Sequence, residues 1–159
     1  MSVPTSEKSP LAHINGAAAA VQLVSLRLGG EAYGIAIDKV LEIILPSPVT
    51  PLPQGPADIL GLINLRNTVV PVVDLRLRLR LAASDETAET RIVVVKVRGR
   101  TIGLLVDAVN QVLRVDPQQF MSPPAMTGSG CEAVIGLANL ASGPLILLDL
   151  ERIFAAEPA

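Results

Sequence analysis

Apolar and polar residues alternate along most of the chain with a period of two, the period of a β-strand that buries one face. In the first such run, Val24 and Leu26 share one face while Arg27 lies on the other. Similar runs predict strands over residues 33–37, 41–45, 59–65, 68–75, 91–97, 101–106, 133–140 and 144–150. The pattern therefore predicts an almost all-β protein, with a short helical turn near the C-terminus, at residues 151–156.

Segments without this period separate the strands. Residues 1–20 are predicted to be a flexible N-terminal tail, and the polar, acidic residues 82–90 are the best candidate for an internal linker. A long loop rich in Pro and Gly is predicted over residues 116–130. Two-residue hairpin turns are predicted at Gly29-Gly30 and at Arg66-Asn67, because glycine and asparagine tolerate positive φ.

The two halves of the pattern repeat each other. GIAIDKV at residues 34–40 matches GLLVDAV at residues 103–109, an offset of 69 given by 103 minus 34. ILGLINL at residues 59–65 matches VIGLANL at residues 134–140, an offset of 75 given by 134 minus 59. Each copy is about 50 to 60 residues long, which is marginal for an independent fold. The repeat therefore predicts two small β-barrels that are related by a pseudo-twofold axis and share an aliphatic core.

The repeat also predicts where the halves begin and end. The first half covers about residues 21–81 and the second about residues 91–154, and exchange of strands between them is left open. Gly34 and Gly103 are expected to occupy equivalent settings.

The two copies differ at two charged positions. Arg66 corresponds to Ala141 in the second copy, and Glu42 corresponds to Gln111. Because the second copy builds the same unit without these charges, Arg66 and Glu42 are candidate functional residues. An exposed turn residue and an exposed strand residue remain the alternative interpretations.

Composition narrows the class of protein. Half of the 159 residues are hydrophobic, but there is no Trp, one Tyr and two Phe, so the core must be aliphatic. A net charge of −2 gives a nucleic-acid partner no electrostatic help. No apolar run approaches the roughly 20 residues of a membrane helix, and the N-terminus lacks the features of a signal peptide. We therefore expect a cytoplasmic protein that does not insert into the membrane.

Side chains suited to catalysis or metal binding are scarce. His13 is the only histidine and lies in the predicted tail, and Cys131 is the only cysteine. A zinc site or a nucleophilic triad would have to recruit them. No phosphate-binding glycine motif is present either. The sequence therefore predicts no enzyme activity, no metal and no cofactor.

Two further charged patterns have structural explanations. Four aspartates recur at equivalent positions of the two copies, which favours capping and turn roles: Asp38, Asp74, Asp107 and Asp149. Residues 75–81 read LRLRLRL, which on a strand would place Arg76, Arg78 and Arg80 on one face. A solvated basic face is favoured there over a site for an acidic protein partner.

Three segments together resemble the CheW-like domains of bacterial chemotaxis. GEAYGIAIDKVLEI at residues 30–43 resembles the opening motif of that family, and GLINLRNTVVPVVDL at residues 61–75 resembles its signature hairpin. GLLVDAV at residues 103–109 is similar to its third block. The order and spacing of the segments indicate a single CheW-like domain over residues 21–157.

The resemblance implies two five-stranded, SH3-like barrels and a non-catalytic adaptor. Such adaptors link the cytoplasmic tips of methyl-accepting chemoreceptors to the regulatory domain of a chemotaxis-type histidine kinase, which has the same fold. In the family, Arg66 and Glu42 fall at positions tied to coupling, and Ile37 and Val40 lie beside the groove for the receptor tip. Asn67 stands where the family usually has Gly, and it adds a side chain beside Arg66 that bears on the choice of partner.

Two other classes of protein stay open. A small ligand-binding or enzymatic barrel would need a polar pocket away from Arg66. A structural oligomer would pair its barrels through exposed strand edges.

Overall fold

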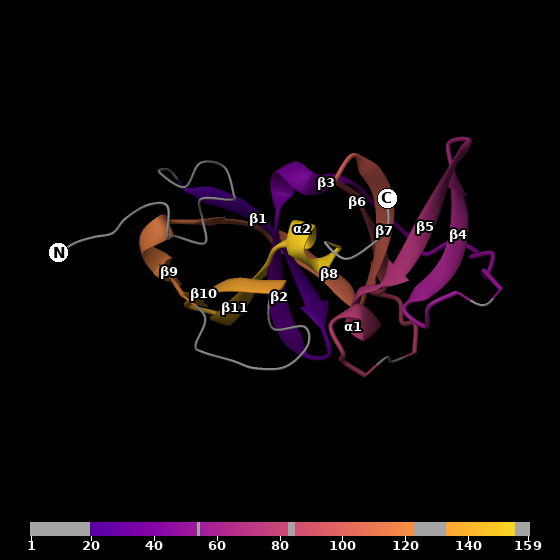
Figure 1. The fold of residues 1–159 in the computed structure, drawn as a ribbon. Coiled ribbons are helices and arrows are strands. Elements are labelled where there is room, and N and C mark those ends of the chain that lie inside the picture. Colours follow the sequence, from indigo (N-terminus) through magenta and orange to yellow (C-terminus); the bar gives the residue numbers. More distant parts are fainter. Residues whose placement is uncertain (1–19, 54, 83–84, 123–132, 155–159) are drawn as a thin grey trace. The chain divides into compact units, whose positions relative to one another are not determined.

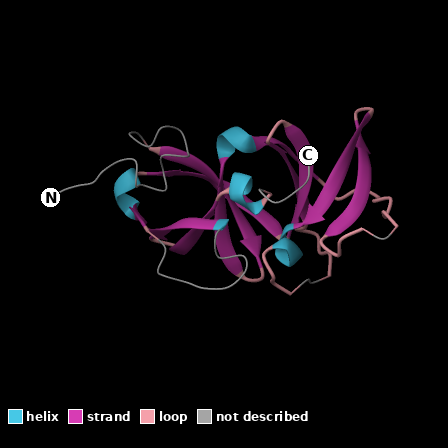
Figure 2. Cartoon of the chain, in the orientation of Figure 1, coloured by secondary structure: helices cyan, strands magenta, loops and turns pink. Residues whose placement is uncertain are grey.

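The computed structural model describes residues 20–53, 55–82, 85–122 and 133–154, and it is almost entirely β (Figures 1 and 2). The predicted all-β class is confirmed. The strands are β1 (Val21–Leu28), β2 (Glu31–Ala36), β3 (Val40–Ile44), β4 (Ile59–Leu65), β5 (Thr68–Asp74), β6 (Arg91–Val97), β7 (Arg100–Val106), β8 (Ala108–Val115), β9 (Phe120–Met121), β10 (Val134–Leu140) and β11 (Gly143–Leu148). The helices are single turns: η3 (Ile37–Lys39), α1 (Leu75–Arg78), η4 (Pro117–Gln119) and α2 (Leu150–Ile153).

The strands form two sheets, and each sheet takes strands from both halves of the sequence. One sheet has the order β8-β1-β2-β11-β10-β9, and the other has the order β3-β6-β7-β5-β4. The chain divides into two compact units. Among the described residues, unit 1 contains residues 20–25, Ala32–Ile37 and those from Asn110 onwards, and unit 2 contains Leu26–Glu31 and those within Asp38–Val109.

The strand registers confirm the sequence repeat. In unit 2, β5 and β7 run parallel with Val72 opposite Gly103, and in unit 1, β11 and β2 run parallel with Leu147 opposite Gly34. Residue 147 follows residue 72 by 75, and residue 103 follows residue 34 by 69, which are the two offsets of the repeat. The expectation that Gly34 and Gly103 occupy equivalent settings is therefore confirmed.

Finer details repeat as well. The β4–β5 hairpin changes register between Ile59 and Gly61, and the β10–β11 hairpin does so at the equivalent residues Val134 and Gly136. Asp74 ends β5, and Asp149 directly follows β11. The side chain of each accepts a hydrogen bond from the backbone two residues later and so caps α1 or α2. The predicted capping role of Asp74 and Asp149 is confirmed.

Each unit has an aliphatic core cluster of its own. In unit 1 it includes Leu23, Ile135, Leu145 and Leu147, and in unit 2 it consists of Ile63, Val70, Val72, Ile92 and Val94. These positions are the apolar half of the alternating pattern, so burial of one strand face accounts for them.

The strand interpretation of residues 75–81 is wrong. Asp74 caps α1, so the chain leaves the sheet there and the three arginines do not share a strand face. Arg76 is buried, and Arg78 is partly buried and pairs with Asp58. Only Arg80 is exposed, at a φ of 65°. The solvated basic face does not form, because burial of Leu75 and Arg76 outweighs the strand-like alternation.

Candidate functional site

The structure brings together the two residues that the repeat comparison selected. Glu42 lies on β3, and Arg66 lies at the tip of the β4–β5 hairpin, both in unit 2. The Arg66 guanidinium pairs with the Glu42 carboxylate at two points: Nη2 donates to Oε1 at 2.7 Å, and Nη1 donates to Oε2. A two-point arginine–carboxylate pair fixes orientation as well as distance.

The hairpin tip is a two-residue turn, as predicted. Leu65 pairs with Thr68, and the two residues between them have φ values of 50° for Arg66 and 67° for Asn67. Positive φ at both central residues is the type I′ geometry, which matches the right-handed twist of the strands.

The counterpart turn in unit 1 is built differently. In that turn Ala141 does not adopt a positive φ, whereas Gly143, which follows the turn, has a φ of 124°. The correspondence of Arg66 to Ala141 is therefore one of sequence and strand register but not of backbone conformation.

Charge and exposure distinguish the two partners. The Arg66 side chain is 73% exposed and the Glu42 side chain 24% exposed. Hydrogen bonds from Arg66 hold the pKa of Glu42 below its usual value, so Glu42 is ionised at neutral pH. The same contact raises the pKa of Arg66. The pair therefore presents a fixed, solvent-facing guanidinium that has five N–H donors.

The remaining predicted site residues divide between the units. Asn67 is exposed beside Arg66, and Val40 is half-buried on β3, two residues before Glu42. Ile37 is also half-buried but belongs to unit 1. The structure thus gathers Glu42, Arg66 and Asn67 into one site, with Val40 on the same strand as Glu42.

Two neighbouring apolar residues were missed by the sequence analysis. Leu41 and Ile43 are 53% and 42% exposed, although they are large and aliphatic. Alternation predicted burial for this strand, but β3 is the edge strand of its sheet, and its register shifts between Val40 and Glu42. Leu41 and Ile43 alternate with Glu42 along β3, so their side chains lie on the opposite face of the strand from the ion pair.

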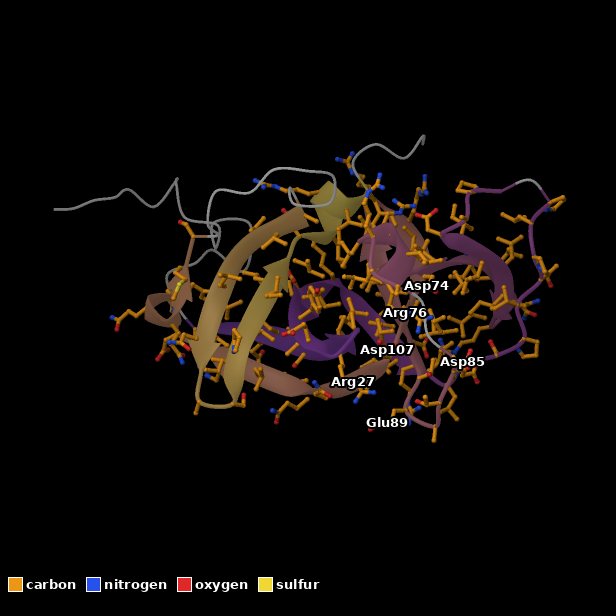
Figure 3. The ribbon with its side chains drawn as sticks, turned by 90° about the horizontal axis from the view of Figure 1, so that it is seen from below. Arg27, Asp74, Arg76, Asp85, Glu89 and Asp107 are labelled. Carbon is orange, nitrogen blue, oxygen red and sulfur yellow. The ribbon has the colours of Figure 1, made fainter. Side chains whose placement is uncertain are left out.

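A second ion cluster in unit 2 is buried and was also missed (Figure 3). Arg76, with 4% of its side chain exposed, donates from Nε and Nη2 to Asp74, both at 2.9 Å, and from Nη1 to Asp107 at 2.7 Å. Asp107 also accepts a hydrogen bond at 2.8 Å from the backbone N–H of Gly29, in the β1–β2 turn. The cluster therefore ties α1, the junction between β7 and β8, and the β1–β2 hairpin together. Its hydrogen bonds, above all those to Asp74, raise the pKa of Arg76.

Within the described ranges, no three His, Cys, Asp or Glu side chains lie close enough together to hold a metal ion. His13 and Cys131 lie outside those ranges. None of the described helices is long and apolar enough to span a membrane.

Comparison with known proteins agrees with this fold. The family model for the CheW-like domain matches residues 22–157. The chain belongs to the CheW-like family. Its CheW-like relatives include the chemotaxis protein CheW of Rhizobium meliloti (strain 1021), which is 34% identical over 137 residues, 86% of this chain and 88% of the relative. The chemotaxis protein CheW of Treponema pallidum (strain Nichols) is 33% identical over 141 residues, 86% of this chain and 83% of the relative.

A solved CheW structure shares the fold. The scaffolding protein TtCheW from Thermoanaerobacter tengcongensis matches with a TM-score of 0.80 at 31% sequence identity, covering 87% of this chain and 94% of that one. CheW-like proteins are chemotaxis scaffolds without catalytic activity, so this chain is a scaffold and not an enzyme.

Proposed function

We propose that this CheW-like protein couples the cytoplasmic tips of chemoreceptors to the regulatory domain of a chemotaxis-type histidine kinase, in the cytoplasm. The proposed coupling surface consists of Val40, Glu42, Arg66 and Asn67, and Ile37 is a further contact. The observation that carries the proposal is the two-point pair between Glu42 and the exposed Arg66, which has no counterpart at Gln111 and Ala141.

The backbone of Arg66 is strained, but this strain is not confined to Arg66. A non-glycine residue at positive φ costs about 1–2 kcal/mol relative to a right-handed conformation. Glycine would avoid this cost, and the chain uses glycines at the β1–β2 turn, where Gly29 and Gly30 have φ values of 60° and 92°. Arg98 adopts the same conformation in the β6–β7 turn, so the positive φ by itself assigns no function, and the two-point pair with Glu42 is what distinguishes Arg66.

Leu41 and Ile43 are exposed on the other face of β3 from Glu42, and a partner that covers this edge strand would meet both faces. Leu41 and Ile43 offer area for a partner to bury, and the ion pair between Glu42 and Arg66 offers orientation. Buried apolar area supplies affinity, whereas a charge-assisted contact fixes the register of the partner.

The test is a double-mutant cycle on the ion pair. The variants are Glu42→Ala, Arg66→Ala and the double substitution, each titrated calorimetrically with the kinase regulatory domain and with a receptor-tip fragment. We expect Arg66→Ala to lower the affinity for at least one partner tenfold or more, which is about 1.4 kcal/mol. If Arg66 donates to the partner directly, Arg66→Ala lowers the affinity more than Glu42→Ala does.

Arg98→Ala is the matched control. Arg98 is also an exposed arginine in a hairpin turn at positive φ, 54°, but it lies in the β6–β7 hairpin. We expect it to leave both affinities unchanged. We also expect Arg66→Ala and Arg98→Ala to change the free energy of unfolding by no more than about 0.5 kcal/mol, since both arginines are exposed. If Arg66→Ala and Arg98→Ala bind both partners equally well, the proposed coupling role of Arg66 is excluded.

A further inference from the structure

Unit 1 contains a hollow between β8 and the tip of the β10–β11 hairpin. The hollow has a volume of about 240 Å³, and none of the described residues that line it carries a charge. Its polar lining comes from Ser25, Asn110, Gln111 and Ser142, and its apolar lining includes Leu113 and Leu145. Ser25 is buried, whereas the other three polar residues are exposed. The hollow therefore opens between β8 and the hairpin tip, and Ser25 lies at its base.

The sequence repeat shows that the fold does not require this polar base. By the offsets of 69 and 75, the five residues of the unit 2 core cluster correspond to Leu23, Ser25, Ala138, Leu145 and Leu147 of unit 1. Four of these belong to the unit 1 core cluster, and the fifth is Ser25, which stands where unit 2 has Val94. Asn110 likewise stands where unit 2 has Leu41. Because unit 2 is built with apolar side chains at both positions, the hydroxyl and the amide need another explanation.

The Ser25 hydroxyl has hydrogen-bonding capacity that the protein leaves unused. A serine hydroxyl can donate one hydrogen bond and accept two. Within the described ranges, the Ser25 side chain makes one hydrogen bond, which it accepts from Asn110 Nδ2 at 3.5 Å, the long limit for such a bond. Its own hydrogen therefore has no acceptor among the described residues, although Ser25 is only 4% exposed. Buried polar groups normally have a partner in the protein, in water or in a ligand.

We propose that the hollow binds a primary carboxamide on a short aliphatic stem, the group that ends the side chain of glutamine. Its oxygen would accept from the Ser25 hydroxyl, and its NH₂ group would donate to the side-chain oxygens of Asn110 and Gln111. The stem would pack on Leu113 and Leu145. A charged group would lose its hydration without gaining a counter-charge from the lining.

The size of the hollow fits such a group. A single water takes up about 30 Å³, so a hollow of about 240 Å³ is larger than one water needs. It is smaller than the roughly 300–1,000 Å³ of sites for drug-sized ligands, so it suits one side-chain group better than a cofactor. This site lies in unit 1, apart from the proposed coupling surface in unit 2, and does not depend on the coupling role.

The first test uses propanamide, which carries the end of the glutamine side chain, titrated into the isotope-labelled full chain and followed by NMR. We expect saturable shifts of the side-chain amides of Asn110 and Gln111. The side-chain amide of Asn67, the counterpart of Ser142 in unit 2, is the internal control and is expected not to shift. Butanone lacks the NH₂ group and propanoate is charged, so both are expected to bind at least about fivefold more weakly. Shifts that do not saturate, which would leave water as the occupant, or equal binding of the three probes would overturn the proposal.

Two further probes distinguish a protein partner from a free small molecule as the source of the carboxamide. N-acetyl-glutamine N-methylamide mimics a glutamine within a peptide, whereas free glutamine carries a charged ammonium and carboxylate. Tighter binding of the first supports a partner side chain, and tighter binding of the second supports a free small molecule. Either result supports the carboxamide site, and failure of both to compete with propanamide contradicts it.

The second test separates binding from stability. Ser25→Ala removes the hydroxyl without adding volume, so we expect a folded protein whose affinity for propanamide falls at least about fivefold. If this variant does not fold, Asn110→Leu decides, because Asn110 is exposed and unit 2 carries leucine at the equivalent Leu41; the same loss is expected. A folded variant with unchanged affinity contradicts the proposal. Arg66→Ala is expected to leave all probe affinities unchanged, so failure here and failure of the coupling proposal are distinguishable.

Discussion

At the scale of single residues, the left-handed backbone of Arg66 and Asn67 determines how the guanidinium meets Glu42. With both φ values positive, the turn closes in two residues, and the Arg66 side chain reaches β3. An insertion in this turn would change its type and redirect the side chain. The ion pair is therefore a property of the turn as much as of the two charged groups.

The ion pair makes part of the stability depend on pH, and the sign follows from the pKa of Glu42. Folding lowers this pKa, so the folded state favours the ionised carboxylate. The stabilisation is complete above the unfolded value of about 4.3 and is lost as the pH falls through the lower folded value. We expect the difference in unfolding free energy between the wild type and Glu42→Gln to be largest at neutral pH and to shrink below about pH 4. Urea titrations at several pH values measure it, and a difference that grows on acidification would contradict the assignment.

The buried Arg76 cluster leads to the largest effect that we expect from a charge substitution. Arg76→Met removes the partner of Asp74 and Asp107 and leaves two carboxylates in a buried site. Loss of one member of a buried ion pair costs about 3–5 kcal/mol. Arg80→Ala, from the same alternating run but exposed, is the control and is expected to change stability by no more than about 0.5 kcal/mol. Urea unfolding compares them, and equal effects would show that Arg76 is not a structural link.

Sequence reasoning identified Arg66 and Glu42 but not their contact. Comparison of the two copies showed that these charges are dispensable for the fold, which is information present in the sequence. The pairing depends on the distance between β3 and a hairpin tip, and residues 24 positions apart in different elements carry no local signal of it. Arg76 was misassigned for the same reason, because its partner Asp107 lies 31 positions away.

At the scale of elements, Gly61 determines how β4 lies against the chain that precedes it. Thr50 and Leu62 exchange backbone hydrogen bonds of 2.8 Å in both directions. A Cβ atom added at Gly61 would lie 2.1 Å from the carbonyl oxygen of Thr50, which is backbone and cannot rotate away. Gly61 also has a φ of 149°, in a region that other residues rarely adopt.

Gly61→Ala is therefore expected to be strongly destabilising. The combined clash and strain should cost about 3 kcal/mol or more, since strained backbone positions alone cost about 1–3 kcal/mol. Gly55→Ala is the control, because its added Cβ would meet its nearest neighbour, Leu52 Cβ, at an ordinary 3.5 Å. Denaturant unfolding of the two variants tests this expectation, and similar midpoints would show that the Thr50–Leu62 bridge yields easily.

Alternation predicted most strands because burial of one face is a local constraint on sequence. It failed at residues 75–81, where a capping aspartate ended the strand, and it did not predict β8, in which three exposed residues follow one another. In both places, tertiary contacts outweighed the local period.

At the scale of the whole molecule, the repeat and the units do not coincide. The copies follow each other in sequence, but the β8-β1-β2-β11-β10-β9 sheet combines β1 and β2 from the first copy with β8 to β11 from the second. The other sheet combines β3 to β5 with β6 and β7. Sequence comparison detects that two copies exist, but it cannot assign strands to sheets, because exchanged and unexchanged strands bury the same faces. Closure of each sheet into an SH3-like barrel stays a prediction.

The exchange of strands means that neither half of the chain should fold alone. Division between Asp85 and Glu86, two exposed residues of the predicted linker, gives fragments 1–85 and 86–159. The first fragment lacks β6 and β7, so β3 loses its only neighbour in the sheet order, and the second lacks β1 and β2, so β8 loses its neighbour. Each fragment would then expose unpaired strand edges and core residues such as Val94 or Leu23.

We expect neither fragment to unfold cooperatively or to give a well-dispersed NMR spectrum. An equimolar mixture of the two fragments is expected to recover both properties. The full chain, cleaved at the same point through an inserted protease site, is the control for the cut itself and should stay folded. A fragment that melts cooperatively on its own would show that one copy of the repeat is a sufficient folding unit.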